Sequence, residues 1–345
     1  MTAAPPAPGV TIRRRSARVR GIWLLVVVAL LVGLAAASLS IGSREVAWSD
    51  IAAALRGEVD SVAQAAIAKR IPRTVLALLA GAALGIAGAV MQGVTRNPLA
   101  DPGILGVNMG AALAIVTGMA WFGLWTQTSM IWTAIGGAAA TALLVYVMGS
   151  LGRGGATPLK LALAGAATSA TLSSFISAVV LPRGDIAGSV RSWQIGGVGG
   201  ATFDGISPAV PFIIVGTVIC LASARALDLL ALGDELAAGL GERVAVVRGL
   251  AALGAVILCG AITAVAGPIA FVGLVVPHVC RLMVGVNHVW LLPFSAAVGA
   301  ALLTASDIVG RVVARPDELA VGIVTAVIGA PFFIAVVRRQ KVRGL

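Results

Sequence analysis

Long apolar runs separated by short polar segments make up most of the chain from residue 22 onward. A helix that crosses a bilayer needs about 20 mostly apolar residues, because it rises about 1.5 Å per residue and the hydrocarbon core is about 30 Å thick. The pattern therefore predicts an all-α membrane protein with about ten transmembrane helices in one domain over residues 22–338. Apolar runs of this length lie at 22–40, 74–93, 103–121, 130–150, 159–181, 207–227, 244–264, 268–286, 290–308 and 319–337.

Two of these runs contain residues that are unusual in a membrane-spanning helix. Residues 159–181 are rich in Ser and Thr, and residues 268–286 contain Pro277, His278 and Arg281. Proline is tolerated inside a helix bundle when a neighbouring group satisfies the carbonyl that it leaves free. Both runs are therefore kept as predicted helices.

Composition agrees with a lipid-facing surface. Of the 345 residues, 59% are hydrophobic and 11% are charged, whereas a soluble domain carries about 25% charged residues. The formal net charge of +11 suggests nucleic acid as a partner, but aromatic residues make up only 5% and Tyr146 is the single tyrosine. Platforms for stacking bases are therefore not expected, and we expect membrane lipid rather than nucleic acid around the chain.

The N-terminal segment has two readings. Five arginines precede the apolar residues 22–39, and the alanines at 35–37 resemble a signal-peptide cleavage site. Eighteen uncharged residues also suffice to span a bilayer, and further runs follow. We favour an uncleaved first helix preceded by a cytoplasmic Arg-rich tail, residues 1–21.

The distribution of Lys and Arg predicts the orientation, because these residues concentrate in cytoplasmic loops. With both termini inside, the inner loops and tails hold sixteen basic residues, including those of the basic tail 339–345, and the outer loops hold nine. The N- and C-termini are therefore predicted to be cytoplasmic. The outer basic residues are Arg44, Arg56, Lys69, Arg70, Arg73, Arg183, Arg191, Arg311 and Arg315.

Small residues and internal symmetry bear on packing. Gly81, Gly85 and Gly88 share one predicted helix and allow close approach to a neighbour. No sequence repeat of 20–50 residues is visible. Residues 74–181 and 244–337 each contain four runs, which leaves open an inverted repeat of spans 2–5 and 7–10.

Several kinds of chemistry find no support in the sequence. The three lysines follow Ala, Leu and Gln, so the Gly-Lys pair of a Walker A phosphate-binding loop is missing. Acidic residues fall in loops or at run ends, which disfavours a proton- or sodium-coupled carrier, although sodium sites built from backbone carbonyls escape this argument. No metal site, bound cofactor or catalytic residue is predicted. Cys220, Cys259 and Cys280 lie in apolar runs and are interpreted as small buried residues.

The inner loop between the sixth and seventh runs, residues 228–242, has an amphipathic pattern. Apolar residues at 229, 230, 232, 236 and 240 alternate with polar or small residues, and Gly233 and Gly241 interrupt the pattern. Short helices with an apolar face are predicted here. Such a helix fits a groove on a partner protein or lies in the membrane interface.

Ordered motifs resemble the FecCD-type permeases, a family of siderophore, haem and cobalamin importers. They extend from about residue 44 to 338, and only the Arg-rich head lies outside. The motifs are Arg70-Ile-Pro-Arg73, residues 85–92, Asn97-Pro-Leu-Ala-Asp-Pro-Gly-Ile-Leu-Gly106, residues 232–241, residues 267–281, Asp307-Ile-Val-Gly-Arg311 and residues 318–332.

This resemblance implies a permease subunit of an ABC importer in the cytoplasmic membrane of a bacterium. It implies a second permease subunit, identical or paralogous, two cytoplasmic ATPase subunits that hydrolyse ATP, and an extracytoplasmic substrate-binding protein. The expected cargo is an iron–siderophore complex, with haem or cobalamin as alternatives. A secondary carrier driven by an ion gradient is the rival from another class.

The resemblance also implies roles for individual residues. Arg70, Arg73 and Arg311 match arginines that pair with glutamates of the binding protein. Thr157 and Pro158 lie where the family places its cytoplasmic gate. Residues expected to couple to the ATPase are Gly233, Asp234, Glu235, Ala237, Leu240 and Gly241.

Overall fold

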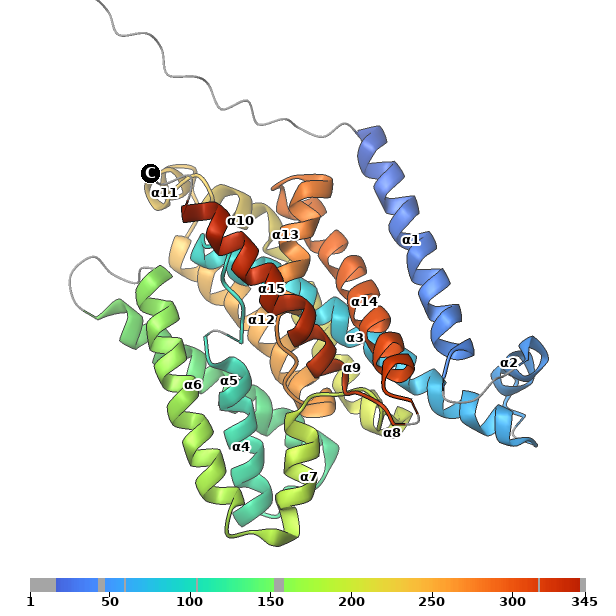
Figure 1. The fold of residues 1–345 in the computed structure, drawn as a ribbon. Coiled ribbons are helices and arrows are strands. Elements are labelled where there is room, and N and C mark those ends of the chain that lie inside the picture. Colours follow the sequence, from blue (N-terminus) through green and yellow to red (C-terminus); the bar gives the residue numbers. More distant parts are fainter. Residues whose placement is uncertain are drawn as a thin grey trace, which may run out of the picture.

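The computed structural model describes residues 17–42, 47–58, 60–103, 105–151, 158–315 and 317–341. All regular secondary structure within these residues is helical, as predicted (Figure 1). The longest described helix, α3 (Val62–Thr95), passes through the bundle and packs against α14, α12 and α13. It is therefore the central helix of the bundle.

Helices occupy all ten predicted runs. Seven helical stretches of the described chain are long and apolar enough to cross a membrane, and three apolar helices are shorter. The long ones are α1 (Ala17–Ser40), α3, α5 (Gln127–Ser150), α6 (Pro158–Val180), the stretch of α8 (Phe203–Ile206), η1 (Ser207–Ala209) and α9 (Val210–Ala222), α12 (Val244–Ala266) and α14 (His288–Val313). The shorter ones are α4 (Val107–Trp121), α13 (Val272–Val284) and the apolar part, Val321–Val336, of α15 (Val321–Lys341).

One helix begins well before the predicted run. α3 starts at Val62 rather than at residue 74, because Ser61 and Gln64 form a capping box. The Gln64 amide N–H donates to Ser61 Oγ at 3.1 Å, and the Ser61 N–H donates to Gln64 Oε1 at 3.2 Å. The charges of Arg70 and Arg73 concealed this first part of the helix from a search for apolar residues.

Short helices lie in the loops. α2 (Trp48–Leu55) precedes α3, and α7 (Gly184–Gln194) follows α6. α10 (Ala224–Leu230) and α11 (Asp234–Gly239) form the predicted pair of short helices between the sixth and seventh runs. Gly233 and Gly241 bound α11 with φ values of +118° and +92°, so this part of the prediction is confirmed.

Glycines bring α3 and α14 into backbone contact. A Cβ placed on Gly81 would lie 2.2 Å from the carbonyl oxygen of Gly299, and one on Gly85 would lie 2.2 Å from that of Ser295. Gly88 meets the carbonyl oxygen of Gly273 in α13 in the same way, at 2.1 Å. The predicted close approach through these glycines is confirmed, and it leaves no space for a larger residue.

A neighbouring side chain supports the proline in α13. Proline has no amide hydrogen, so Pro277 leaves the carbonyl of Gly273, four residues earlier, without its helical donor. The side-chain amide of Gln92 in α3 donates to that carbonyl at 3.1 Å, and Arg281 donates to the Gln92 Oε1. Because Gln92 replaces the missing donor, α13 continues through the proline.

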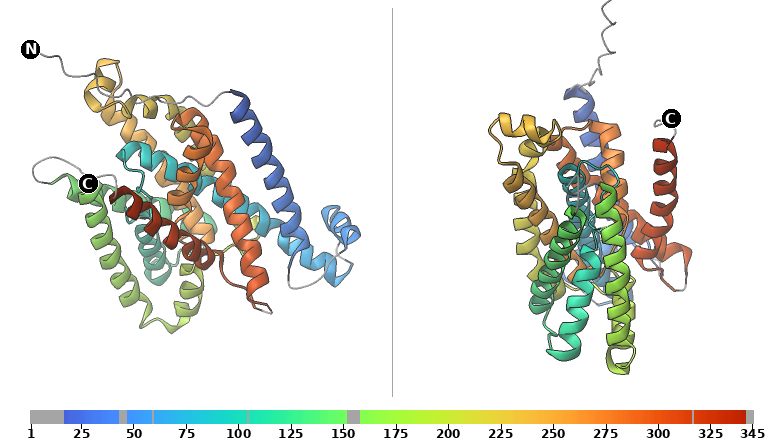
Figure 2. Two further views of the ribbon diagram at one scale, coloured as in Figure 1. Left: turned by 45° about the horizontal axis from the view of Figure 1, so that its top comes forward. Right: turned by 90° about the vertical axis from the view of Figure 1, so that its left-hand side faces the viewer.

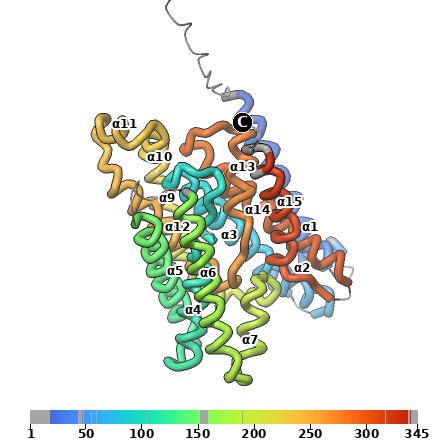
Figure 3. The backbone as a smooth tube through the Cα atoms, turned by 60° about the vertical axis from the view of Figure 1, so that its left-hand side comes forward, coloured from blue at the N-terminus to red at the C-terminus, as the bar shows by residue number. Residues whose placement is uncertain are grey.

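The bundle has two distinct ends. α10 and α11 lie at one end, together with the first turn of α1 and the last turn of α15, and α2, α7 and α8 lie at the other (Figures 1 and 2). α4, α5 and α6 form one flank of the bundle (Figure 3), with α4 packed against α5 and α6. The start of α1 and the last turn of α15 therefore lie at the same end of the bundle, as an even number of membrane crossings requires.

Candidate functional site

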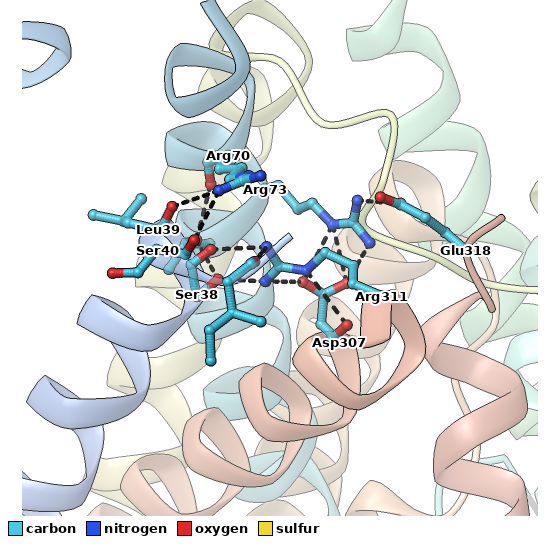
Figure 4. A network of polar contacts seen from close by, with 10 residues as sticks. Ser38, Leu39, Ser40, Arg70, Arg73, Asp307, Arg311 and Glu318 are labelled. Carbon is cyan, nitrogen blue, oxygen red and sulfur yellow. Dashed lines mark hydrogen bonds and ion pairs between the residues drawn. The ribbon is translucent and has the colours of Figure 1, made fainter. Parts of the chain in front are cut away.

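Three predicted site residues meet at the end of the bundle opposite α11. Arg70 and Arg73 lie on α3 and Arg311 lies on α14, and their guanidinium groups join a network of polar contacts (Figure 4). We define the arginine network as these arginines with the residues that they contact. Its other members are Ser38, Leu39, Ser40, Ile41, Asp307 and Glu318.

Asp307 is the centre of the arginine network. Its carboxylate accepts from Arg73 Nη2 at 2.8 Å and forms an ion pair with Arg311 Nη2 at 2.9 Å. Asp307 is 1% exposed and Arg311 is 2% exposed. A buried carboxylate between two guanidinium groups is stable only while all three charges remain together, because removal of one leaves a buried charge unpaired.

The outer arginines also hold the end of α1 and the segment before α15. Arg311 Nη1 donates to the carbonyl of Ser38 at 2.7 Å, and Arg70 Nη1 donates to that of Leu39 at 2.9 Å. Arg73 Nη1 forms an ion pair with Glu318, whose side chain is 40% exposed. The network thus joins α1, α3 and α14 to the segment that leads into α15.

The docking role predicted for these arginines stays a prediction. Arg70 is 7% exposed and Arg73 is 9% exposed, so their guanidinium groups contact the chain itself rather than project into solvent. The sequence did not identify Asp307 and Glu318 as their partners. The spacing of four residues between Asp307 and Arg311 was an available signal, since such pairs are neighbours on one helix face.

The α10–α11 segment, residues 228–242, forms the second site. Leu232, Leu236 and Leu240 are 56%, 62% and 62% exposed, whereas Ala237 is fully buried against the bundle. Of the other predicted coupling residues, Asp234, Glu235 and Gly241 are exposed beside these leucines, and Gly233 is half-buried. Three exposed leucines at one end of a short helical segment make an apolar surface that a partner protein can cover.

Two aspartates attach the α10–α11 segment to the long helices. Asp234 Oδ1 accepts from Arg248 in α12 at 2.9 Å and from Arg96, which follows α3. Asp228 accepts from the backbone N–H of His288 at 2.8 Å and from the side chain of Asn287 at 2.8 Å. Sequence reasoning assigned no role to Asp228.

The predicted gate lies at the edge of the described residues. Thr157 is outside them, and Pro158 is the first residue of α6. A cavity of about 380 Å³ lies near the start of α6, lined in part by Asn97, Asp101, Leu159 and Phe333. It lies between the loop after α3, the start of α6 and α15, so this loop contributes to a cavity next to the start of α6.

Charged side chains of the described residues do not gather into a metal centre. No group of three or more His, Cys, Asp or Glu side chains lies close enough to hold an ion within the described ranges. Cys220, Cys259 and Cys280 are buried, as predicted. The chemistry that this arrangement offers is therefore ion pairing and helix docking.

Comparison with known proteins identifies the family. A model of the FecCD transport family matches residues 28–339. The chain is 42% identical over 332 residues to the ferric enterobactin transport system permease protein FepD of Escherichia coli (strain K12), an alignment that covers 96% of this chain and 97% of FepD. It is 39% identical over 330 residues to the Fe(3+)-citrate import system permease protein YfmD of Bacillus subtilis (strain 168), covering 95% and 98% of the two chains.

A solved structure shows the same fold. The protein is described as a metal-chelate type ABC transporter in an inward-facing conformation, and it matches with a TM-score of 0.78 and 29% sequence identity. The match covers 92% of this chain and 99% of the other. Together with the apolar helices and the family match, it shows that the chain is an integral membrane permease and belongs to the FecCD transport family.

Proposed function

We propose that the chain is the permease subunit of an ATP-driven importer that carries an iron(III)–siderophore complex across the cytoplasmic membrane of a bacterium. The observation that carries this proposal is the similarity to FepD, which extends over 96% of this chain and 97% of FepD. YfmD, whose name specifies ferric citrate, supports a ferric chelate as the cargo class. Haem and cobalamin are the alternative cargoes.

A separate ATPase subunit supplies the energy in this proposal. The chain lacks the Gly-Lys pair of a phosphate-binding loop, and the α10–α11 segment carries three exposed leucines. A short amphipathic helix suits an apolar groove of a partner protein. The residues proposed to couple the two subunits are Gly233, Asp234, Glu235, Ala237, Leu240 and Gly241.

The proposed orientation places the α10–α11 end in the cytoplasm. The excess of Lys and Arg in the loops and tails of that end supports this orientation. Ten transmembrane helices, with α4, α13 and α15 as the shorter ones, then leave both termini inside. The cytoplasmic gate would include Pro158, the first residue of α6, and Thr157, which lies outside the described residues.

Two mostly exposed helices differ in a way that supports a second permease subunit. α1 has the highest mean hydropathy of the seven long helices, and α6 has the lowest. Lipid suits α1. The exposed face of α6 carries hydroxyl residues, including Thr171, Ser174 and Ser177, and we propose that it faces the transport path and the second subunit rather than lipid.

The opposite end would receive the substrate-binding protein. Arg70, Arg73 and Arg311 gather positive charge there, and complementary carboxylates on a partner would steer docking. Arg73 and Glu318 form the part of the arginine network that reaches the surface, because the Glu318 side chain is 40% exposed. A carboxylate of the binding protein would replace Glu318 on Arg73.

An uptake assay in cells tests the proposal. Cells that lack the gene, and cells to which it has been restored, are tested with one cargo at a time. The cargoes are the ⁵⁵Fe-labelled chelates of enterobactin, citrate and a hydroxamate, then haem, then cobalamin. We expect uptake of one ferric chelate to require the gene and to persist when a protonophore is added while ATP is maintained. Uptake that collapses with the protonophore would favour the ion-coupled carrier, and uptake of haem or cobalamin alone would reassign the cargo.

A further inference from the structure

The helix α11 is connected to the chain on either side of it through two glycines. Gly233 and Gly241 bound α11, both have positive φ, and no atom lies within 4 Å of the position that a Cβ would occupy at either residue. Glycine at such positions changes conformation at little steric cost. A force applied to α11 alone would therefore be absorbed by rotation at these two glycines, unless side chains attach α11 to the bundle.

Asp234 provides the first attachment. It lies in the first turn of α11, and its Oδ1 accepts hydrogen bonds from two guanidinium groups that belong to different parts of the bundle. Arg96 follows the last residue of α3 and has the left-handed backbone conformation, with φ of +50°. Arg248 lies in the first turns of α12. One carboxylate thus joins α11 to two long helices.

Asp228 provides the second attachment, six residues earlier in α10. Its carboxylate accepts from the His288 backbone N–H and contacts His288 Nδ1 at 2.7 Å. The N-cap residue of α14, Asn287, makes no side-chain cap of its own and instead donates to Asp228 at 2.8 Å. Asp228 therefore takes the place of an N-cap for α14. The His288 ring also packs beside Gly93 of α3.

The helices held by these two aspartates continue to the other end of the bundle. Arg96 follows the last residue of α3, and Arg73 lies in the first half of the helix, about 34 Å away along its axis at about 1.5 Å per residue. α14 begins beside Asp228 and carries Asp307 in its last turns. Backbone contact at Gly81 and Gly85 prevents α3 and α14 from sliding independently.

We propose that Asp228 and Asp234 are positioning residues that transmit displacement of the α10–α11 segment to α3, α12 and α14. The inference rests on the proposed function, because the displacement comes from the ATPase subunit. Asp234 holds α11 to α3 and α12, and Asp228 holds α10 to α14. Without these contacts the segment still binds the ATPase, but its motion is absorbed at Gly233 and Gly241.

The experiment compares Asp234→Asn and Asp228→Asn with a matched control, Asp185→Asn. Asp185 pairs with Arg183 at 2.9 Å, and their side chains are 59% and 36% exposed, close to the 49% and 29% of Asp234 and Arg248. The hydrogen bond from Arg183 lowers the pKa of Asp185, so the control also removes a charged carboxylate. Asp185 lies in the first turn of α7, and α7 is at the end of the bundle opposite α11 (Figure 1).

Each variant is assembled with the ATPase and binding protein and reconstituted in vesicles. The ⁵⁵Fe chelate that gives the most uptake with the unmodified complex is used throughout. We expect Asp228→Asn to retain co-purification with the ATPase and ATP hydrolysis within about twofold. In both Asp228→Asn and Asp234→Asn, the amount of chelate imported per ATP hydrolysed should fall at least about fivefold. Asp185→Asn should import as much chelate per ATP hydrolysed as the unmodified complex. Asp234→Glu, which keeps the carboxylate, should retain most of that ratio.

Each outcome decides for or against the inference. An unchanged ratio of import to hydrolysis in Asp234→Asn and Asp228→Asn would overturn it. If Asp234→Asn does not assemble, the double variant Arg96→Gln with Arg248→Gln removes both partners of Asp234 without altering α11, and an unchanged ratio in that variant would equally overturn the inference. Absence of ATP-driven import by the unmodified complex would instead contradict the proposed function, so the two failures are distinguishable.

Discussion

The two ends of the bundle use the same kinds of charged side chain in opposite ways. In the arginine network, Asp307 and Arg311 are at most 2% exposed and every guanidinium group contacts the chain itself. In the α10–α11 segment, Asp234 is about half exposed and its arginine partners are about one-third exposed. Apolar leucines beside Asp234 remain uncovered. The charged groups of the first end find partners within the chain, whereas the second end leaves apolar side chains exposed.

This difference indicates which end can change partners at low cost. Breaking a buried ion pair leaves a desolvated charge, whereas an exposed pair exchanges readily with water or with another protein. The α10–α11 end is thus suited to receive a moving subunit, and the arginine network is suited to hold α1, α3 and α14 together. Four substitutions test this comparison, in order of expected effect.

The largest effect is expected for Asp307→Ala. The substitution leaves Arg73 and Arg311 buried without their shared carboxylate, so the folded state should lose about 3–5 kcal/mol. Thermal unfolding in detergent measures the change. Asp317→Ala, at an exposed position near the same end, is the control and should be nearly neutral. Equal stability of the two variants would contradict the assignment of a buried ionic centre.

The second-largest effect is expected at the backbone contact between α3 and α14, the two helices that run between the ends of the bundle. Gly85→Ala places a Cβ 2.2 Å from the carbonyl oxygen of Ser295 and should destabilise the fold by about 1–3 kcal/mol. The control is Gly33→Ala in α1, where no atom lies within 4 Å of the added carbon. The same unfolding measurement applies. Equal stability of Gly85→Ala and Gly33→Ala would show that α3 and α14 are less tightly packed than described.

A smaller effect, confined to partner binding, is expected for Leu236→Asp. The side chain is 62% exposed, so unfolding should be unchanged, while binding of the ATPase subunit should weaken by about 1–2 kcal/mol, or about 5- to 30-fold. Titration of the purified ATPase measures the affinity. Leu181→Asp, 82% exposed and remote from α11, serves as the control. Unaltered affinity in Leu236→Asp would remove the docking role of α11.

The smallest effect is expected at the surface of the arginine network. Glu318→Gln frees Arg73 for a carboxylate of the binding protein, so that affinity should rise by about two- to fivefold at low salt and less at high salt. Asp317→Asn, the exposed neighbour, controls for the change in charge. Weaker binding by Glu318→Gln would show that Glu318 itself contributes to docking.

Much of the fold could be predicted from local patterns in the amino-acid sequence. Apolar length located every long helix, and the glycines of α3 indicated close contact with a neighbouring helix, because these features depend on residues near one another in the sequence. Which helix makes that contact was not predicted. The true start of α3 was missed, because its charged side chains find partners far away in the sequence. Arg73 pairs with Asp307 and Glu318, more than 200 residues away, and Arg70 donates to backbone carbonyls at the end of α1.

The candidate sites were predictable only in part. Motif resemblance selected Arg70, Arg73 and Arg311, and the structure brings them together. Whether a side chain faces inward or outward depends on tertiary partners, which a single sequence does not reveal. Asp228 illustrates the same limit, because its role arises only when the end of α10 meets the start of α14, sixty residues later. The docking and coupling roles stay predictions.

Reconstitution of the purified chain in vesicles tests the central claim most directly. Vesicles are prepared with the chain alone and with the chain assembled with its ATPase and binding protein, and accumulation of ⁵⁵Fe chelate is measured with ATP and with an imposed ion gradient. The account predicts accumulation only in the assembled vesicles and only with ATP. Accumulation by the chain alone, driven by the gradient, would contradict it.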